Sequence, residues 1–252
     1  MKLTQNTIFI TGGASGIGRG LAEAFHQRGN KVIIGGRRKA LLDEVVAANP
    51  GMEAIELDVA DAASIATAAQ TLIARYPSLN VVINNAGIMP FDDAGGVIDD
   101  SAMRGLIDTN LLGPIRLTSA LIEHLKRQPA ATIIHNTSVL AFVPLAATAV
   151  YSATKAALHS YAMSQRFMLR DSTVKVLEIA PPWVDTDLIK KSGDPRAMPL
   201  DAFIAETMQG LAQDGEEVVV EAVRGFRANP GPGEYELFNG FNAAMMANPI
   251  PV

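Results

Sequence analysis

The sequence predicts an α/β protein whose doubly wound, Rossmann-like parallel sheet is flanked by helices on both faces. Short β-branched runs alternate with helical stretches, which is the pattern of a parallel sheet joined by right-handed crossovers. The runs are almost continuously apolar, as expected when helices cover both faces of a sheet. A glycine-rich turn follows the first run. The predicted strands are Thr7–Ile10, Lys31–Ile34, Ala54–Leu57, Val81–Ile83, Thr132–His135 and Val174–Ile179.

Length and composition favour a single domain over residues 1–252. Of the 252 residues, 48% are apolar and 19% are charged, and no repeat, low-complexity tract or linker divides the chain. The net charge is −5 and the basic residues are scattered, which argues against nucleic acid or an anionic membrane as partner. The chain has no cysteine and no apolar stretch near the length of a membrane span. We therefore expect a soluble cytoplasmic protein.

Three helices follow from the apolar periodicity between these strands. The first covers Gly16–Arg28 and ends at Gly29, a residue typical of a helix C-terminus. The second covers Asp99–Lys126 and is interrupted at Pro114. The third covers Val150–Arg170, and its apolar side chains lie around much of its circumference. Because such a helix needs covering on more than one side, a homo-oligomer is expected, either a homodimer or a homotetramer.

The turn Thr11–Gly18 follows the first predicted strand and opens the first helix. In this context backbone amides and the helix dipole can receive a pyrophosphate, and glycine lets the backbone come close to it. The spacing is Gly-x-x-x-Gly-x-Gly and differs from the general dinucleotide pattern Gly-x-Gly-x-x-Gly. The position between strand and helix nevertheless favours nucleotide binding over a plain turn. The predicted contacts are Gly12, Ser15, Gly16, Ile17 and Gly18.

Two arginines at the end of the second strand indicate the cofactor. A site for NAD usually places an acidic residue on the adenosine ribose here, whereas an arginine accommodates the 2′-phosphate of NADP. This chain has Arg37 and Arg38. Basic residues at the start of a helix oppose its dipole, so a phosphate partner would offset a small local penalty. The sequence therefore predicts NADP(H).

The segment from Tyr151 to Lys155, together with Ser138 upstream, predicts proton-transfer chemistry. Helical residues four apart lie on one face, so the Lys155 ammonium can favour the ionised form of Tyr151. A phenol whose ordinary pKa is about 10 then becomes an acid or base usable near neutral pH. The hydroxyl of Ser138, at the end of a strand, can orient a carbonyl.

Together these motifs resemble the short-chain dehydrogenase/reductase family, in its single-domain form near 250 residues. The similarity covers about residues 5–190 and also includes Asn110. It implies a catalytic set of Asn110, Ser138, Tyr151 and Lys155, with hydride supplied by the cofactor. The further cofactor contacts that it implies are Asp58, Val59, Asn85, Ala86, Gly87, Tyr151, Lys155, Pro181, Val184 and Thr186.

Two prolines bear on this resemblance. Pro114 cannot hydrogen-bond the carbonyl of Asn110, where the family places a water that bridges to the catalytic lysine. A simple helix kink is the alternative reading. Pro182 stands where the family commonly has glycine, and it stiffens the turn that carries Val184 and Thr186. The resemblance thus predicts NADPH-dependent reduction of a ketone or aldehyde to an alcohol. The alternatives are a non-catalytic NADP(H)-binding sensor and an epimerase or lyase that uses the cofactor transiently.

An apolar substrate pocket is predicted from residues that follow the catalytic strands. A small-molecule carbonyl compound or alcohol of hydrophobic character would suit it. Residues 187–215 are expected to form a mobile lid over this pocket. The apolar tail 229–252 either closes the pocket or packs on a partner subunit. The predicted lining residues are Met89, Phe91, Phe142, Leu145, Trp183 and Met198, with Pro90 and Val143 beside them.

No metal site is predicted, because the histidines show no metal-ligand spacing with nearby carboxylates. His135 is expected in the core. The histidines on helices are expected at the solvated surface, as is Glu217 with its neighbour Glu216.

Overall fold

A seven-stranded parallel sheet with the order β3-β2-β1-β4-β5-β6-β7 forms the centre of the molecule. The computed structural model describes residues 1–189, 191, 193–228, 231 and 233–250. All six predicted strands are confirmed, and a short edge strand, β7, adds to them. The strands are β1 Thr7–Thr11, β2 Lys31–Gly36, β3 Glu53–Glu56, β4 Leu79–Asn84, β5 Ala131–Asn136, β6 Val174–Ile179 and β7 Glu217–Val218.

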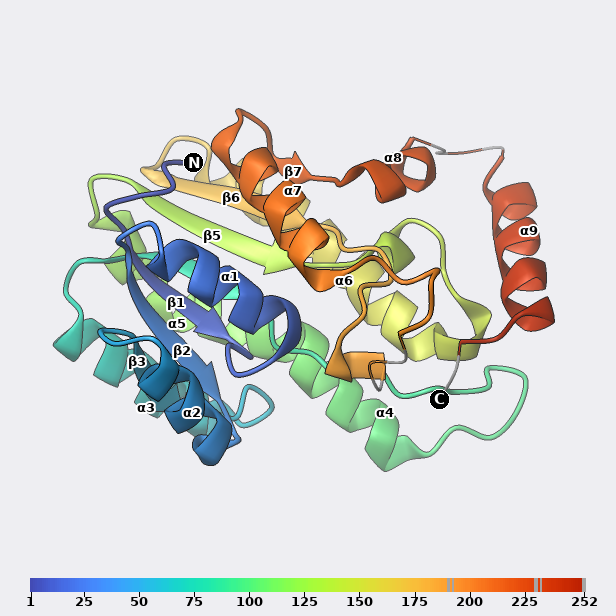
Figure 1. Cartoon of the computed structure of the whole chain (residues 1–252), viewed down its shortest axis with the longest axis horizontal. Coiled ribbons are helices and arrows are strands. Elements are labelled where there is room, and N and C mark those ends of the chain that lie inside the picture. Colours follow the sequence, from blue (N-terminus) through green and yellow to red (C-terminus); the bar gives the residue numbers. More distant parts are fainter. Residues whose placement is uncertain (190, 192, 229–230, 232, 251–252) are drawn as a thin grey trace.

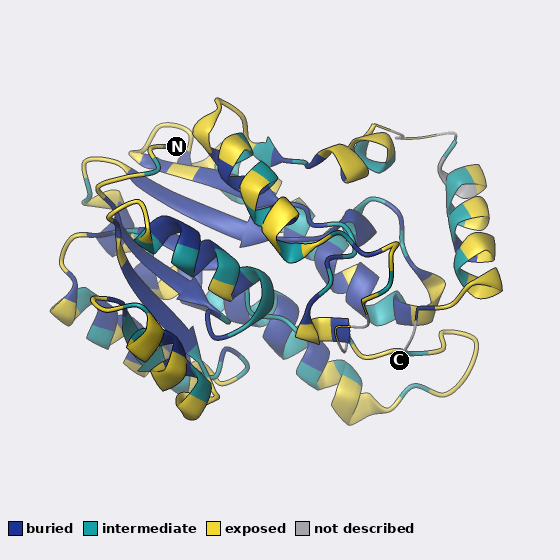
Figure 2. Ribbon diagram, viewed as in Figure 1, coloured by how far each residue is buried: buried dark blue, intermediate teal, exposed yellow. Residues whose placement is uncertain are grey.

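Helices lie on both faces of the sheet (Figure 1), and the strands of the sheet are largely buried (Figure 2). Two apolar cores lie between these helices and the sheet. Successive strand residues point to opposite faces, so Ile8 and Ile10 belong to one core and Phe9 belongs to the other. The first core is covered by α1 Gly16–His26, α2 Lys39–Ala48 and α7 Leu200–Ala212. The second is covered by α3 Ala62–Arg75, α5 Gly113–Lys126 and α6 Ala149–Leu169. The predicted doubly wound fold is therefore confirmed.

The predicted helix Asp99–Lys126 is three consecutive elements. It consists of α4 Asp100–Ile107, a π-helical turn Asp108–Leu112, and α5. Pro114 lies in the first turn of α5, where a missing amide proton costs nothing. The interruption thus precedes the proline and is centred on Asn110.

The chain ends in two helices beyond the sheet, α8 Glu221–Arg227 and α9 Glu234–Ala247 (Figure 1). Asn242 fastens α9 to the segment before α6. Its side chain donates to the carbonyl of Pro144 at 3.0 Å and accepts from the amide of Ala146 at 2.5 Å. Parts of the predicted lid (190 and 192) and tail (229, 230, 232, 251 and 252) lie outside the described residues. Among the helices that the structure describes, none has the length and apolar character needed to cross a membrane.

Candidate active site

The carboxyl ends of the central strands open onto a cavity of about 1210 Å³. β1 pairs with β2 on one side and with β4 on the other, so the strand order reverses at this point. In open α/β sheets, ligands bind in the crevice at such a reversal. The turn after β1 and the segment after β4 both line the cavity here.

The glycine turn brings backbone close to backbone. Gly12 has φ +67°, and a Cβ there would lie 2.9 Å from the Cα of Ala86. A Cβ at Gly18 would lie 2.3 Å from the carbonyl oxygen of Gly12 and 2.4 Å from Nδ2 of Asn85. Gly12 lines the cavity together with Ser15, Gly16 and Ile17, as predicted. Gly18 does not line it, because this residue lies behind the turn and allows α1 to approach it.

Arg37 and Arg38 reach the same end of the cavity. Nη2 of Arg38 donates to Oγ of Ser15 at 2.7 Å, which ties the end of β2 to the glycine turn. Nη1 of Arg37 lies 4.0 Å from Oδ2 of Asp58, and the Arg37 side chain is 62% exposed. Its guanidinium is therefore accessible to a phosphate, and the site presents two cations beside the glycine turn.

Asn85 connects three strands under the cavity floor. Its Nδ2 donates to the carbonyl of Thr11 at 2.9 Å, and its Oδ1 accepts from Nδ2 of Asn136 at 2.8 Å. The hydroxyl of Thr11 accepts from the amides of Asn85 and Ala86, each at 3.0 Å. Asn85 and the following residues up to Met89 line the cavity, as do Asp58 and Val59.

Ser138, Tyr151 and Lys155 line the cavity across from the glycine turn, and all three are buried. Tyr151 and Lys155 lie on successive turns of α6. Nζ of Lys155 donates to the carbonyl of Asn136 at 2.8 Å, which fixes its direction from the end of β5. Oγ of Ser138 accepts from the amide of Leu140 at 3.1 Å, and the Ser138 side chain acts on the pKa of Tyr151.

Burial dominates the proton equilibria of this group. It raises the pKa of Tyr151 to about 12, an effect that the hydrogen bond with Ser138 opposes. Burial also lowers the pKa of Lys155 to about 8, while the negative charge of Glu178 opposes that change. The expectation that Lys155 lowers the Tyr151 pKa did not include burial, which acts in the opposite direction. Nζ of Lys155 lies 5.5 Å from the centre of the Tyr151 ring.

Asn110 supports the site from behind. Its side chain donates to the carbonyl of Ile88 at 2.9 Å and accepts from the amide of Ile88 at 3.0 Å. Its Nδ2 also lies 3.5 Å from Oγ1 of Thr154, next to Lys155 on α6. Asn110 therefore holds the segment after β4 against α6, while its side chain is absent from the cavity lining.

Most of the predicted substrate pocket forms the far part of this cavity. Met89, Leu145, Trp183 and Met198 line it, as do Pro90, Pro181, Val184 and Thr186. The structure places the other predicted residues elsewhere. Phe91 lines a separate cavity of about 390 Å³ beside α4. Phe142 packs edge-on against His159, and Val143 is buried in the core. No local pattern indicates that the chain turns away from the cavity at Phe91 and at Phe142.

The C-terminal segment supplies one wall of the cavity. Phe226 of α8, Phe241 and Met245 of α9, and Ile250 all line the cavity. Phe226 and Phe241 pack edge to face, with ring centres 5.8 Å apart. Of the two roles left open for the tail, this arrangement matches closure of the pocket. The apolar character of the tail is the sequence feature that indicates this role.

The predicted lid consists of two different parts. Its first part, as far as the structure describes it, lines the cavity with residues 187–189 and 195–199, and a bridge joins Val184 to Met198. Arg196 donates to the carbonyls of Asn248 and Pro249 and lies over the ring of Trp183. Helix α7, by contrast, buries side chains in the first core. Only the part before α7 is positioned to cover a substrate.

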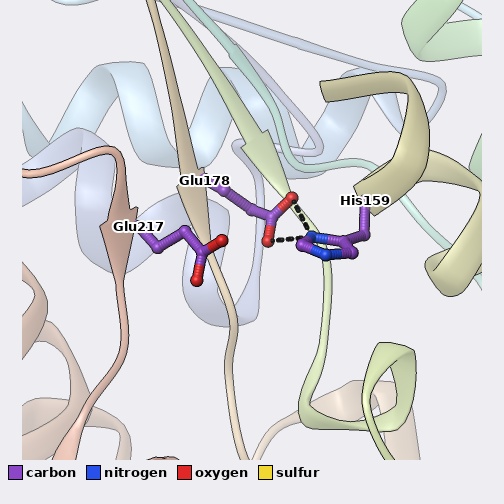
Figure 3. A group of neighbouring side chains, drawn as sticks. All are labelled: His159, Glu178 and Glu217. Atoms are coloured by element: carbon purple, nitrogen blue, oxygen red, sulfur yellow. Dashed lines mark hydrogen bonds and ion pairs between the residues drawn. The ribbon is translucent and has the colours of Figure 1, made fainter. Parts of the chain in front are cut away.

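The histidines correct a second expectation. His135 is fully buried and hydrogen-bonded to Gln165, as predicted for a core residue. His124 is also buried and contacts the carbonyl of Leu79, rather than lying at the surface. Figure 3 shows His159 beside two carboxylates, Glu178 and Glu217. The expectation rested on spacing along the sequence, whereas the fold places two carboxylates near His159, because α6, β6 and β7 bring these residues together from distant parts of the chain.

The glycine turn, the two arginines Arg37 and Arg38, and the group of Ser138, Tyr151 and Lys155 surround one cavity. This arrangement is that of an oxidoreductase with a Rossmann-like fold. A model of the short chain dehydrogenase family matches residues 6–197, and the chain belongs to this family. The resemblance seen in the motifs is thereby confirmed.

Relatives and solved structures agree with this assignment. The chain is 40% identical over 233 residues to the uncharacterized oxidoreductase DltE of Bacillus subtilis, covering 90% of this chain and 92% of the relative. It is 33% identical over 227 residues to an uncharacterized oxidoreductase of Myxococcus xanthus, covering 86% and 85%. A short chain dehydrogenase from Burkholderia cenocepacia, solved with NADP, superposes with a TM-score of 0.81 at 26% identity over 100% of both chains.

Proposed function

We propose that this protein is an NADP(H)-dependent carbonyl reductase, which also catalyses the reverse oxidation of the alcohol. One observation carries the proposal: a single cavity joins the glycine turn and its two arginines to Ser138, Tyr151 and Lys155. When bound, the nicotinamide supplies the hydride. Ser138 orients the substrate carbonyl, Tyr151 donates the proton to its oxygen, and Lys155 holds the nicotinamide ribose.

The geometry of the glycine turn supports a dinucleotide. A Cβ at Gly12 or Gly18 would meet backbone atoms, so the turn has the close packing that a pyrophosphate cradle needs. The exposed guanidinium of Arg37, with Arg38 beside Ser15, supports NADP(H) over NAD(H), because both cations lie where a 2′-phosphate is expected. The Burkholderia relative was solved with NADP, which agrees with this preference.

Reduction of a panel of ketones and aldehydes, followed by loss of reduced-nicotinamide absorbance, tests the proposal. We expect turnover with NADPH, and a fall of roughly 10²-fold or more in kcat when Tyr151→Phe removes the proton donor. Tyr161→Phe is a matched control, because Tyr161 lies on the same helix and packs on His135 away from the cavity. Turnover that survives in Tyr151→Phe would refute the role of this residue, and a preference for NADH would refute the role of Arg37.

Two structural proposals accompany this function. The part of the predicted lid before α7 covers a bound substrate, since its described residues 187–189 and 195–199 line the cavity and Arg196 contacts the C-terminal segment. A homo-oligomer is also proposed, because Phe167 and Met168 on α6 are 64% and 76% exposed. Light scattering of the purified chain measures the second directly, and a monomeric mass would contradict it.

A further inference from the structure

A group of charged side chains around one buried carboxylate joins α6, β6, β7 and α8. Glu178 on β6 is 1% exposed, and both of its carboxylate oxygens face Nδ1 of His159, at 2.8 and 3.0 Å (Figure 3). Glu217 on β7 receives two hydrogen bonds from Arg227 of α8, at 2.7 and 3.0 Å. Ligand atoms of His159, Glu178 and Glu217 lie within 4.8 Å of one another. Because Arg227 already engages both oxygens of Glu217, the chemistry is that of an ion-pair network rather than of a metal site.

This network contacts the active site on several sides. His159 lies one helical turn after Lys155 on α6. Glu178 pairs in register with His135, the neighbour of Asn136, and the carbonyl of Asn136 accepts the hydrogen bond from Lys155. Lys155 is thus anchored on β5 beside the strand that carries Glu178.

The same network reaches the two other walls of the cavity through aromatic contacts. Phe142, which follows the Ser138 turn, packs edge-on against His159 with ring centres 5.2 Å apart. The guanidinium of Arg227 lies 5.0 Å from the centre of the Phe142 ring. Phe226, next to Arg227 on α8, lines the substrate part of the cavity. A shift of the charged groups would therefore displace the turn at Ser138, helix α6 and the wall of the pocket at Phe226 together.

We propose that Glu178 and His159 are a positioning pair for Lys155, and that Glu217 and Arg227 extend this pair to the wall of the substrate pocket. The proposal rests on the proposed function of Lys155. A charged carboxylate is stable in the interior only when it is paired or when it stabilises a neighbouring charge. Glu178 does both, since it pairs with His159 and favours the charged form of Lys155. Neither Glu178 nor His159 lines the cavity.

Charge is the second way in which Glu178 acts on Lys155. Burial favours the neutral amine of Lys155, and the carboxylate of Glu178 opposes this effect. Two other titratable groups close to Lys155 are uncharged near neutral pH, because burial raises the pKa of Tyr151 to about 12 and lowers the pKa of His135 to about 4. Glu178 itself faces His159, Glu217 and Arg227, and the last two form an ion pair with each other.

Glu178→Gln removes this charge at constant size and tests the proposal. Without it Lys155 loses its proton at lower pH, so the alkaline limb of the pH profile of kcat/KM should move down by roughly one pH unit. Glu216→Gln is the matched control, since Glu216 precedes Glu217 and is exposed in its ion pair with Arg166. An alkaline limb that stays at the wild-type position in Glu178→Gln would overturn the proposal.

His159→Asn tests the positioning of Lys155 separately from the charge of Glu178, because this variant keeps the Glu178 carboxylate and removes only the imidazole. We expect kcat to fall roughly tenfold with the alkaline limb in place, since a small misplacement of a catalytic group slows catalysis. Wild-type kcat in this variant would overturn the positioning role.

The pH dependence of Lys155 acylation by acetic anhydride, measured by mass spectrometry, is a readout that needs no turnover. Glu178→Gln should shift this curve to lower pH as well, and an unshifted curve counts against the proposal. If the wild type reduces no carbonyl compound, the proposed function fails, while the acylation curve still decides the effect of Glu178. If Glu178→Gln does not fold, the kcat of His159→Asn decides.

Discussion

Substitution of Gly18 by alanine should separate cofactor binding from overall folding. A Cβ at this position would lie 2.3 Å from the carbonyl oxygen of Gly12, and ordinary contact begins near 3.4 Å. The two atoms must therefore move apart by about 1.1 Å, which is 3.4 minus 2.3. Neither of the two contacting groups can move easily. The carbonyl oxygen of Gly12 belongs to the backbone, and Nδ2 of Asn85, which would lie 2.4 Å from the Cβ, is held by its hydrogen bond to the carbonyl of Thr11.

A displacement of this size should weaken binding more than stability. Hydrogen bonds become weak when they lengthen by about 1 Å. The loss of one or two charge-assisted bonds from the turn to a pyrophosphate costs about 3 kcal/mol, or roughly 100-fold in the Kd for NADPH. Overpacking itself should cost about 1–3 kcal/mol of unfolding free energy. Fluorescence titration with NADPH and urea denaturation measure the two quantities.

Gly240→Ala is the control for this prediction. Gly240 lies in α9 and does not line the cavity, and a Cβ there meets no atom within 4 Å. Alanine should therefore raise the unfolding free energy by about 0.5–1 kcal/mol and leave NADPH affinity unchanged. If Gly18→Ala bound NADPH as tightly as the wild type, the reasoning that links the glycine turn to the cofactor would be refuted.

Three further predictions concern the catalytic helix and the core. Asp92→Ala should cost about 0.5–2 kcal/mol in urea denaturation, because the Asp92 carboxylate caps α6 by accepting from the amides of Ala149 and Val150, at 2.9 and 3.0 Å. Phe203→Ala should cost about 3–5 kcal/mol in the same assay, since this ring is fully buried, and a loss below that range would mean that the core refills the space. The pKa of Lys155 falls from 10.5 to about 8 on folding, so the unfolded chain binds the extra proton between these values and stability should rise with pH there. Lys155→Met should remove that rise when unfolding is compared at about pH 7.5 and 9.5, and an unchanged pH dependence would contradict the burial of Lys155.

Local sequence determined the sheet, the glycine turn and the catalytic group. Each of the six long strands carries its own apolar pattern, so its position needs no knowledge of the partner strand. The glycine turn and the pair Tyr151 and Lys155 are likewise local, because their spacing is fixed by one turn or one helix. The edge strand β7 has two residues, which is too short for any periodic pattern.

Tertiary structure decided what surrounds those motifs. His159 meets Glu178, and Glu217 meets Arg227, only after β6 and β7 have joined the sheet edge and α8 has packed beside it. Local pattern also could not show that Phe142 turns toward His159, or that α9 returns to the pocket through Asn242. The physical reason is the same in each case. Spacing along the chain fixes which side chains share a helix face or a strand face, whereas burial and charge depend on segments that only folding brings together.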